Sequence, residues 1–523
     1  MSLTAEAELT MAKRKAKETA ARSLRWLLNG IADAPPVAIT GISADSRTVA
    51  KGDVFLACRG ATNHGLTFTA DVIASGAAAI VWDSETDGQP GADEGVKDGV
   101  VMVPVAGLSD RLGEIANRWF GAPSRRMKLS GVTGTNGKTT VAFLIAQSMH
   151  LLNTRCAYVG TLGAGIETLE RQAGLTTPGC IDLHRNLADF ASRGARHTAL
   201  EVSSHALAQK RVDGLAFDSV LFTNLSRDHV DYHGSMQAYG ETKARFILAQ
   251  DARHRIINID SDFGRQLLAR STNDAVAVST AGNTSDEARL FLQMQAVGRD
   301  DCGTTVRIRG SWGENAFYLP LAGDFNAANA ALVLAQLLCW GIPLQAAVDA
   351  LTHVTPPPGR MQKVTLPTET LAPTVFVDYA HTPAGLEAVL GTLRAHCKGK
   401  LWCVFGCGGD RDKGKRGAMG ETVARLADQP VVTTDNARSE SPGEIIAVVM
   451  DGMPAGSSAI AIEDRAAAIA FAIAAAADED IVLIAGKGHE NYQVVGNLRR
   501  PFSDYQVALA NLAVRLPAEG RAP

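Results

Sequence analysis

Hydrophobic runs in the last third of the chain are each followed by a polar, glycine-containing or charged cluster. Four such runs occupy residues 374–377, 401–405, 431–434 and 481–485. Runs that are apolar along most of their length predict strands buried on both faces, as in a parallel sheet covered by helices. Ligands bind beyond the carboxyl ends of such strands. The four clusters therefore predict one functional edge of a Rossmann-like sheet, because tight turns explain any one cluster but explain four poorly.

The middle of the chain shows the same alternation. An apolar run starting at Met127 predicts a short buried strand, residues 131–140 a glycine loop, and residues 141–146 the start of a helix. Two further runs, 198–200 and 220–222, also end in polar clusters. Parallel strands place their carboxyl ends at one edge, so the polar residues that follow these runs are expected near the glycine loop. These residues are Glu201, Ser203, Asp228 and His229.

The pattern predicts an α/β protein with three domains. Residues 1–22 are an Ala/Lys/Glu-rich extension, helical or disordered, and residues 23–124 are expected to form a first domain with strand-like runs at 53–57 and 78–81. The charged stretch 85–99 predicts a surface loop within that domain. A central domain with a P-loop-type, mainly parallel sheet covers 125–355, and a C-terminal Rossmann-like domain covers 356–523 after the stiff run Pro356-Pro357-Pro358-Gly359.

Composition narrows the class of protein. The chain has 523 residues, 46% of them hydrophobic and 20% charged, which is ordinary for a soluble globular protein. A net charge of −4 argues against a generic nucleic-acid binder, and no apolar stretch approaches the length that spans a bilayer. The eight cysteines are scattered, and no second pair completes a zinc site with Cys403 and Cys407. We expect a cytoplasmic monomer with reduced cysteines and no membrane insertion.

The glycine loop carries the most specific chemistry. Gly134-Thr135-Asn136-Gly137-Lys138-Thr139-Thr140 joins the predicted strand to the predicted helix, so backbone N–H groups and the helix N-terminus converge on one point. Lys138 supplies a charge for the terminal phosphates of a nucleotide, and Thr139 supplies a hydroxyl for Mg²⁺. Val132 stands where the strict Walker pattern has glycine, so this is a variant phosphate loop. The alternative to a phosphate loop is a glycine-rich turn without a binding function, in which Lys138 is solvated.

Glu201, at a strand end, is the best candidate to join Thr139 at Mg²⁺, because that ion takes oxygen ligands. The alternative interpretation is that Glu201 is a buried glutamate that forms a structural ion pair. His229 is a less usual Mg²⁺ ligand, and by itself it indicates a hydrogen-bonded core histidine.

Together these motifs resemble the Mur ligases, the ATP-dependent amide-bond ligases of peptidoglycan precursor synthesis. The resemblance rests on Gly134–Thr139, Glu201–His205 and Asn224–His229, and it extends from about Ile42 to Asn511. The sequences 378–383 and 486–490 are similar to the branch of the family that adds the third amino acid. The implied substrates are ATP, UDP-N-acetylmuramoyl-dipeptide and meso-diaminopimelate.

The resemblance implies an acyl-phosphate mechanism that uses two Mg²⁺ ions. Thr139 and Glu201 would hold one ion, and Glu201 and His229 would hold the other. Lys243 matches the lysine that the family carbamylates with CO₂, which turns a cation into an anionic oxygen donor. Without the resemblance, Lys243 would be interpreted as a surface helix lysine.

Further roles are implied residue by residue. His381 is placed near the transferring phosphate. ATP contacts are expected from Asn326, Asn329, Arg360 and Asp378. Contacts with the UDP-linked substrate are expected from Ser46, Thr176, Thr177, Ser203 and Arg211.

The third amino acid is the main specificity question. Diaminopimelate has a distal zwitterionic head that lysine lacks, and the planar fork of arginine suits its carboxylate. The expected binding residues are Arg411, Asp435, Asn436, Arg438, Gly486 and Glu490. Ala437 replaces a proline that is usual in the diaminopimelate-type motif, but this replacement removes no contacting side chain.

Four alternatives stay open at this point. Two are ligases, namely the counterpart that adds L-lysine and a folylpolyglutamate-type ligase. The third is a P-loop switch or transport ATPase, which would release phosphate without an amine acceptor. The fourth is a non-catalytic nucleotide-binding scaffold.

Overall fold

The computed structural model describes residues 21–60, 63–85, 95–170, 175–271, 275–283, 288–300, 303–366 and 372–515. Most of the predicted extension, residues 1–20, lies outside the described residues. The chain divides into two compact units. The first contains the residues up to Met127 together with 178–194 and 205–216, and the second contains 128–177, 195–204 and the rest of the chain from Phe217. The predicted division at residues 124 and 355 stays a prediction.

The first unit is built on a five-stranded sheet of order β3-β4-β5-β7-β6, in which only β6 runs antiparallel to its neighbour. Its strands are β3 (Gly41–Ser43), β4 (Asp53–Ala57), β5 (Ala79–Asp83), β6 (Gly95–Lys97) and β7 (Val100–Val105), and a separate pair joins β1 (Arg22–Ser23) to β2 (Ala38–Ile39). The helices of this unit include α2 (Leu24–Leu27), α3 (Thr69–Ala74), α4 (Leu108–Phe120) and α6 (Cys180–Ser192). The prediction of a loop over 85–99 is wrong at residues 95–97, because exposed β6 pairs with β7; residues 86–94 lie outside the described part.

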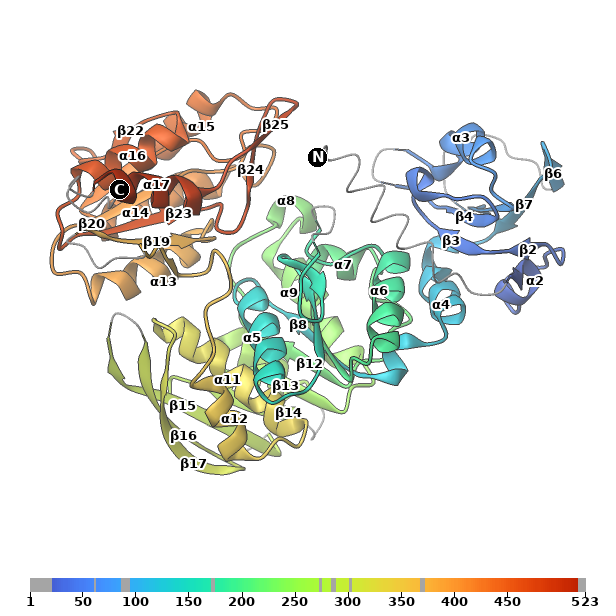
Figure 1. Ribbon diagram of the computed structural model, residues 1–523, viewed down its shortest axis with the longest axis horizontal. Coiled ribbons are helices and arrows are strands. Elements are labelled where there is room, and N and C mark those ends of the chain that lie inside the picture. Colours follow the sequence, from blue (N-terminus) through green and yellow to red (C-terminus); the bar gives the residue numbers. More distant parts are fainter. Residues whose placement is uncertain are drawn as a thin grey trace, which may run out of the picture. The chain divides into compact units, whose positions relative to one another are not determined.

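The second unit contains a ten-stranded, mainly parallel sheet of order β10-β9-β11-β8-β12-β13-β14-β15-β16-β17. The parallel strands are β8 (Lys128–Thr133), β9 (Cys156–Gly160), β11 (His197–Glu201), β12 (Ser219–Phe222), β13 (His254–Asn258), β14 (Ala275–Ser279) and the start of β15 (Leu290–Arg299). Short β10 (Gly163–Gly165) and the meander β15, β16 (Thr304–Gly310) and β17 (Gly313–Leu319) complete it with antiparallel pairs (Figure 1).

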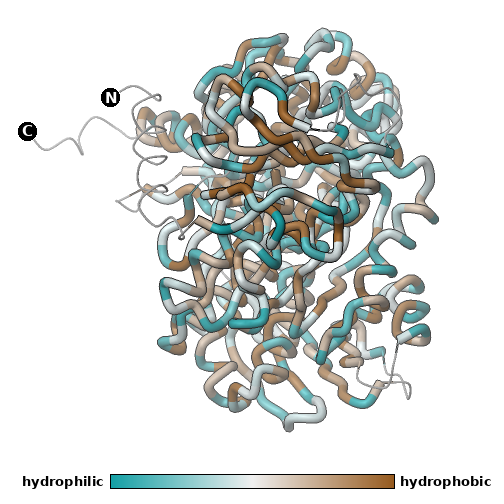
Figure 2. The backbone as a smooth tube through the Cα atoms, turned by 90° about the vertical axis from the view of Figure 1, so that its right-hand side faces the viewer, coloured by the Kyte–Doolittle hydropathy of each residue, from teal (hydrophilic) through white to brown (hydrophobic). Residues whose placement is uncertain are grey.

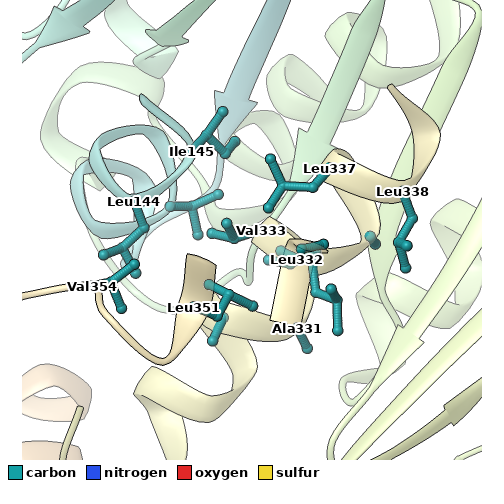
Figure 3. Close-up of a cluster of buried hydrophobic side chains, with 14 of the residues drawn as sticks. Leu144, Ile145, Ala331, Leu332, Val333, Leu337, Leu338, Leu351 and Val354 are labelled. Atoms are coloured by element: carbon teal, nitrogen blue, oxygen red, sulfur yellow. The ribbon is translucent and has the colours of Figure 1, made fainter. Parts of the chain in front are cut away.

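Helices cover this sheet with a dense apolar core. They are α5 (Lys138–Leu151), α7 (Ser204–Ala208), α8 (Val230–His233), α9 (Met236–Ala249), α10 (Asp262–Ala269), α11 (Asp324–Cys339) and α12 (Leu344–Leu351), although α7 extends across the boundary between the two units. Leu144 and Ile145 of α5 meet Val333 and Leu337 of α11 in the buried cluster of Figure 3. Helix α11 is buried over most of its surface, which explains its nearly continuous run of alanine, leucine and valine.

The C-terminal part of the second unit has a six-stranded sheet of order β18-β19-β23-β20-β21-β22. Its strands are β18 (Gln362–Lys363), β19 (Thr374–Asp378), β20 (Leu401–Phe405), β21 (Gln429–Val432), β22 (Ile460–Ala461) and β23 (Ile481–Ala485). Only β18 is antiparallel, so the four predicted strands do run parallel. The helices are α13 (Pro383–Arg394), α14 (Lys415–Leu426), α15 (Pro442–Asp451), α16 (Arg465–Ala475) and α17 (Asp504–Val514), and β24 (Tyr492–Val495) forms a hairpin with β25 (Leu498–Pro501).

The predicted α/β fold class is thereby confirmed. Extended hydrophobic segments run through the interior of the trace in Figure 2, as expected for sheets covered on both faces. Within the described residues, no helix is long and apolar enough to cross a membrane.

Candidate active site

The glycine loop lies between β8 and α5, as predicted. Gly134 and Gly137 adopt φ values of +148° and +84°, which residues with a Cβ atom rarely adopt. Space also requires glycine, because a Cβ on Gly134 would lie 1.9 Å from Oγ1 of Thr223 and one on Gly137 would lie 2.4 Å from Oδ1 of Asn329. The loop therefore depends on close approach of side chains from other elements.

The segment after β12 holds this loop in shape. The Asn224 carbonyl accepts the Thr135 N–H at 2.8 Å, and its side-chain Oδ1 accepts the Asn136 N–H at 3.0 Å. The hydroxyl of Thr223 donates to the Asn136 carbonyl at 2.6 Å. Thr223 and Asn224 were not among the predicted site residues. Their position directly after the apolar run 220–222 is the signal that indicates them.

Two lysines bring their ammonium groups to the loop. Lys138 Nζ donates to the carbonyls of Gly134 and Thr135 at 3.0 and 2.7 Å, and Lys243 Nζ donates to the Gly134 carbonyl at 2.8 Å. Burial lowers the pKa of Lys138. Burial and, next, the positive charge of Lys138 hold the pKa of Lys243 well below its ordinary value. The structure thus places Lys243, on α9, at the phosphate loop and not at the surface, and its carbamylation stays a prediction.

Glu201, the last residue of β11, is fully buried beside the start of α5. Its Oε2 accepts a hydrogen bond from the Thr139 hydroxyl at 2.8 Å. The oxygen of that hydroxyl in turn accepts a hydrogen bond from Nη2 of Arg360 at 3.1 Å. Strand β11 pairs with β8 in parallel, with Glu201 opposite Val132, which explains how residues 62 positions apart meet. A carboxylate and a hydroxyl in contact at a helix N-terminus form an oxygen donor set of the kind that Mg²⁺ prefers.

Asp228 and His229 follow β12 in the same loop as Asn224. The His229 N–H donates to Oδ1 of Asp228 at 3.0 Å, and its Nε2 lies 3.4 Å from Oδ2. Burial raises the pKa of Asp228, but the charge that His381 carries once protonated in acid, followed by those of His229, Lys415 and Lys138, outweighs burial and lowers it. Asp228 is therefore an anion within a group of cationic and imidazole side chains.

His381 lies after β19 and is neutral at physiological pH. Its Nδ1 bonds the Tyr379 carbonyl at 2.8 Å, and a carbonyl can only accept, so Nδ1 carries the proton and Nε2 the lone pair. Burial and then the positive charge of Lys415 lower its pKa to about 4. Lys415, at the start of α14, was not among the predicted residues.

The predicted ATP-contacting residues beyond the loop bond mainly to the protein itself. On α11, Asn329 donates to Asn326 at 3.3 Å. The Arg360 guanidinium lies over the Tyr379 ring at 4.3 Å. Asp378 accepts the N–H groups of Met361 and Ala380, both at 2.7 Å, and burial raises its pKa. The nucleotide contacts of these residues stay predictions.

The residues predicted to bind the UDP-linked substrate are divided between the units. In the second unit, the Thr177 hydroxyl donates to the Glu201 carbonyl at 2.7 Å and accepts the Ser203 N–H at 3.1 Å, and Thr176 accepts a hydrogen bond from Thr161 at 3.2 Å. In the first unit, Ser46 begins a short 3-10 helix, and Arg211 Nε donates to Gln209 at 3.0 Å.

Four of the residues predicted to bind the third amino acid, Asp435, Asn436, Gly486 and Glu490, form a cluster at the ends of β21 and β23, whereas Arg411 lies in the loop after β20. Asn436 donates to Oε2 of Glu490 at 2.8 Å. Lys487, which was not predicted, is fully buried and donates to Glu490 at 2.9 Å and to Asn436 at 3.1 Å. A Cβ on Gly486 would lie 2.6 Å from Oδ2 of Asp435.

The loop that contains Ala437 is tied to the β24–β25 hairpin. The Arg438 N–H donates to the Val494 carbonyl at 3.1 Å, and the Gly496 N–H donates to the Arg438 carbonyl at 2.6 Å. Arg438 Nη1 donates to the Gly409 carbonyl at 2.5 Å. These bonds fix the loop without the proline that Ala437 replaces.

An ion pair with no exposed surface lies beneath this cluster. Arg465 donates to both carboxylate oxygens of Asp504 at 2.7 and 2.8 Å, and to the Ala485 carbonyl at 2.9 Å. It therefore ties the end of β23 to α17. Sequence reasoning missed it, because an arginine in a helix gives no sign of burial.

The folding stability is expected to fall as the pH is lowered from about 6.5 towards 4. His197, at the start of β11, has its pKa lowered to about 4 by burial and then by the charge of Lys128, whereas the unfolded chain binds the proton near 6.5. The unfolded state therefore binds more protons in this range, and stability is lost as pH falls. Between pH 7.5 and 5.0, the Tm of the parent protein should fall roughly 3 °C more than that of His197→Phe. Equal falls in calorimetry would contradict this.

Three family descriptions match the chain. The Mur ligase family catalytic domain matches residues 38–120, the Mur ligase middle domain 132–337 and the Mur ligase glutamate ligase domain 359–488. A relative from Alkalilimnicola ehrlichii, named UDP-N-acetylmuramoyl-L-alanyl-D-glutamate–2,6-diaminopimelate ligase, is 43% identical over 496 residues, which are 93% of this chain and 97% of the relative.

Solved structures are also similar. One, of a UDP-N-acetylmuramoyl-L-alanyl-D-glutamate–2,6-diaminopimelate ligase, has a TM-score of 0.64 and 33% identity, covering 95% of this chain and 99% of its own. A folylpolyglutamate synthase from Mycobacterium tuberculosis, complexed with ADP and AMPPCP, has a TM-score of 0.57 and 20% identity, covering 79% and 95%. The second likeness concerns the fold alone.

Proposed function

The chain belongs to the Mur ligase family, and on that basis we propose that it joins 2,6-diaminopimelate to the D-glutamate of UDP-N-acetylmuramoyl-L-alanyl-D-glutamate. It is an ATP-dependent ligase that forms ADP and phosphate, in peptidoglycan precursor synthesis. The observation that carries the proposal is the convergence of Lys138, Thr139 and Glu201 on a loop that the protein itself holds in shape.

The residues at the loop fit a magnesium ion. Thr139 and Glu201 would hold it, since their oxygens lie 2.8 Å apart at the N-terminus of α5. When bound, Mg²⁺ neutralises charge on the β- and γ-phosphates. The described residues contain no group of three or more His, Cys, Asp and Glu side chains placed to hold a metal. For the second ion, the proposed ligands are Glu201, His229 and the modified side chain of Lys243.

The chain's own groups support a two-step reaction. An oxygen of the D-glutamyl carboxylate attacks the γ-phosphorus, and ADP leaves with the electrons of the broken P–O bond. The amine of the amino acid then attacks the acyl carbon, phosphate leaves, and the amine loses a proton. Lys138 and the N–H groups at the N-terminus of α5 stabilise the negative charge that gathers in both steps. Neutral His381 offers Nε2 as a hydrogen-bond or proton acceptor.

Lys243 is proposed to carry a carbamate. Its lowered pKa favours the neutral amine, which adds to CO₂ with loss of one proton. The product is an anion within a site that already contains the Lys138 cation. Burial of Lys243 against the Gly134 carbonyl places the group at the phosphate loop.

The cluster at the ends of β21 and β23 is proposed as the amino-acid site. Arg438 and Arg411 would bind the carboxylates of diaminopimelate, and Glu490 its distal ammonium. Oε2 of Glu490 already accepts two hydrogen bonds, from Lys487 and Asn436, which leaves Oε1 for the substrate. The L-lysine-adding counterpart is the second candidate, and it needs no arginine fork for a distal carboxylate, which L-lysine lacks.

An ADP-release assay tests the function. We expect ADP only when the UDP-linked dipeptide and an amino acid are both present, and meso-diaminopimelate should exceed L-lysine in kcat/KM by roughly a hundredfold. ADP release without an acceptor would indicate an ATPase of another kind, and use of a folate substrate would indicate a folylpolyglutamate-type ligase. Equal turnover of the two amino acids would overturn the assignment of diaminopimelate.

The same assay with Arg438→Lys tests the specificity. Lysine keeps the charge but loses the bidentate fork, so preference for diaminopimelate should fall roughly tenfold while the KM for ATP is unchanged. Arg425→Lys is the matched control, because Arg425 pairs with Glu387 at the surface of α13 and α14.

A further inference from the structure

The Glu201 carboxylate accepts hydrogen bonds from two residues of the β9–β10 hairpin. Tyr158, in β9, donates its hydroxyl to Oε1 at 2.5 Å, and the Thr161 N–H donates to the same oxygen at 2.9 Å. The Thr161 hydroxyl shares its single proton between Oε2 at 3.1 Å and the Thr176 hydroxyl at 3.2 Å. None of the roles assigned above to the phosphate loop uses Tyr158 or Thr161.

The two carboxylate oxygens have different surroundings. Oε1 accepts from a buried phenol and a backbone N–H, neither of which can turn away without disturbing β9. Among the described residues, Oε2 accepts only from the hydroxyls of Thr139 and Thr161, which can rotate to offer a lone pair instead. Oε2 is therefore the oxygen that can exchange its hydrogen bonds for a metal ion.

The turn is shaped to keep this arrangement. A Cβ on Gly160 would lie 2.1 Å from Oε1 of Glu201 and 2.5 Å from the Tyr158 hydroxyl, so glycine makes room for the hydrogen bond. The Tyr158 ring is fully buried and packs edge-on against Phe143 of α5 at 5.9 Å between centroids. Leu162 N–H donates to the phenol oxygen at 3.3 Å, which fixes the direction of its O–H.

We propose that Tyr158 and Thr161 are positioning residues that hold Oε1 of Glu201, so that Oε2 faces the metal ion at the phosphate loop. The proposal rests on the function proposed above, in which Glu201 is a magnesium ligand. Thr161 also connects this ligand to Thr176, a residue expected at the UDP-linked substrate. Outer partners of metal ligands typically contribute 10–100-fold to metal affinity.

The test measures Mn²⁺ binding to the protein–ADP complex by electron paramagnetic resonance, and ADP binding without metal by calorimetry. Tyr158→Phe keeps the ring and removes one hydroxyl. We expect it to weaken Mn²⁺ binding about 10–100-fold and to leave metal-free ADP binding unchanged. Tyr318→Phe, the matched control, removes a tyrosine–Asp300 hydrogen bond of 2.8 Å on β17, and it should change neither quantity.

Thr161 provides an independent arm. Thr161→Val removes only the hydrogen bond to Oε2, which the metal ion would displace, and keeps the N–H that holds Oε1, so it should weaken Mn²⁺ binding far less than Tyr158→Phe does. If Tyr158→Phe binds Mn²⁺ as the parent does or loses metal-free ADP binding equally, or if Thr161→Val weakens Mn²⁺ binding as much as Tyr158→Phe, the positioning role is refuted. Glu201→Gln separates the two proposals. If it binds Mn²⁺ normally, the assignment of Glu201 as a ligand fails, and if it alone is weak, only the roles of Tyr158 and Thr161 fail.

Discussion

Replacing Lys243 by alanine should reduce kcat by roughly a thousandfold, because the variant loses the carbamate that is proposed to support a metal ion at the phosphate loop. The side chain is buried, and its pKa is lowered well below the ordinary value, so the loss of a free ammonium is not expected to matter. Formate, acetate or propionate should restore part of the activity by entering the space that the side chain leaves.

Lys243→Met is the matched control for this rescue. Methionine fills the same space without a nitrogen, so the variant should be as inactive as the alanine variant and should not respond to short acids. Nuclear magnetic resonance with ¹³C-labelled bicarbonate provides a readout that does not depend on activity, since the carbamate signal should be absent from both variants. Near-normal activity of Lys243→Ala would refute the proposed carbamate.

The second large effect is expected for Lys138→Met. This change removes the cation that the carbonyls of Gly134 and Thr135 hold at the loop, and we expect kcat to fall roughly a thousandfold. Lys128→Met is the control at the other end of β8, where Nζ donates only to the Trp340 carbonyl at 3.3 Å.

ADP-release kinetics and thermal melting of both lysine variants distinguish a catalytic role of Lys138 from a structural one. Lys128→Met should keep kcat within about twofold. A Lys138→Met variant that melts normally and turns over at the parent rate would show that the loop binds phosphate through its backbone alone.

Sequence patterns predicted the strands that are apolar along their whole length. Strands β20 and β23 have the predicted bounds 401–405 and 481–485, since both faces of each strand are buried and the apolar run has no gap. The run 431–434 was placed too late, because β21 ends at Val432 and the hydroxyl of Thr434 instead donates to the Glu463 carbonyl. The meander β15–β17 was missed, although β16 alternates buried and exposed residues with period two.

The same distinction, between what a local sequence pattern indicates and what only the folded structure brings together, applies to the site residues. Lys138, Thr139 and Glu201 could be predicted because each stands at the end or start of a strand or helix with a recognisable pattern. Tyr158 could not, because its partner Glu201 lies 43 residues away and the contact depends on β9 pairing with β11. Lys487 lies within a predicted cluster, but charge alone does not indicate that a lysine is buried between Asn436 and Glu490.

The position of β8 in its sheet has a consequence for how the protein is made. Its two neighbours, β11 and β12, both come later in the chain, and the residues that shape the phosphate loop, through Ser226, come later still. A ribosome therefore releases the loop long before it releases its support, since synthesis runs from the N-terminus. Nascent chains that end before Ser226 carry the motif in their sequence but lack the hydrogen bonds that shape it. Nucleotide binding thus marks a chain that has been made past β12 and has paired it with β8, and not merely a translated motif.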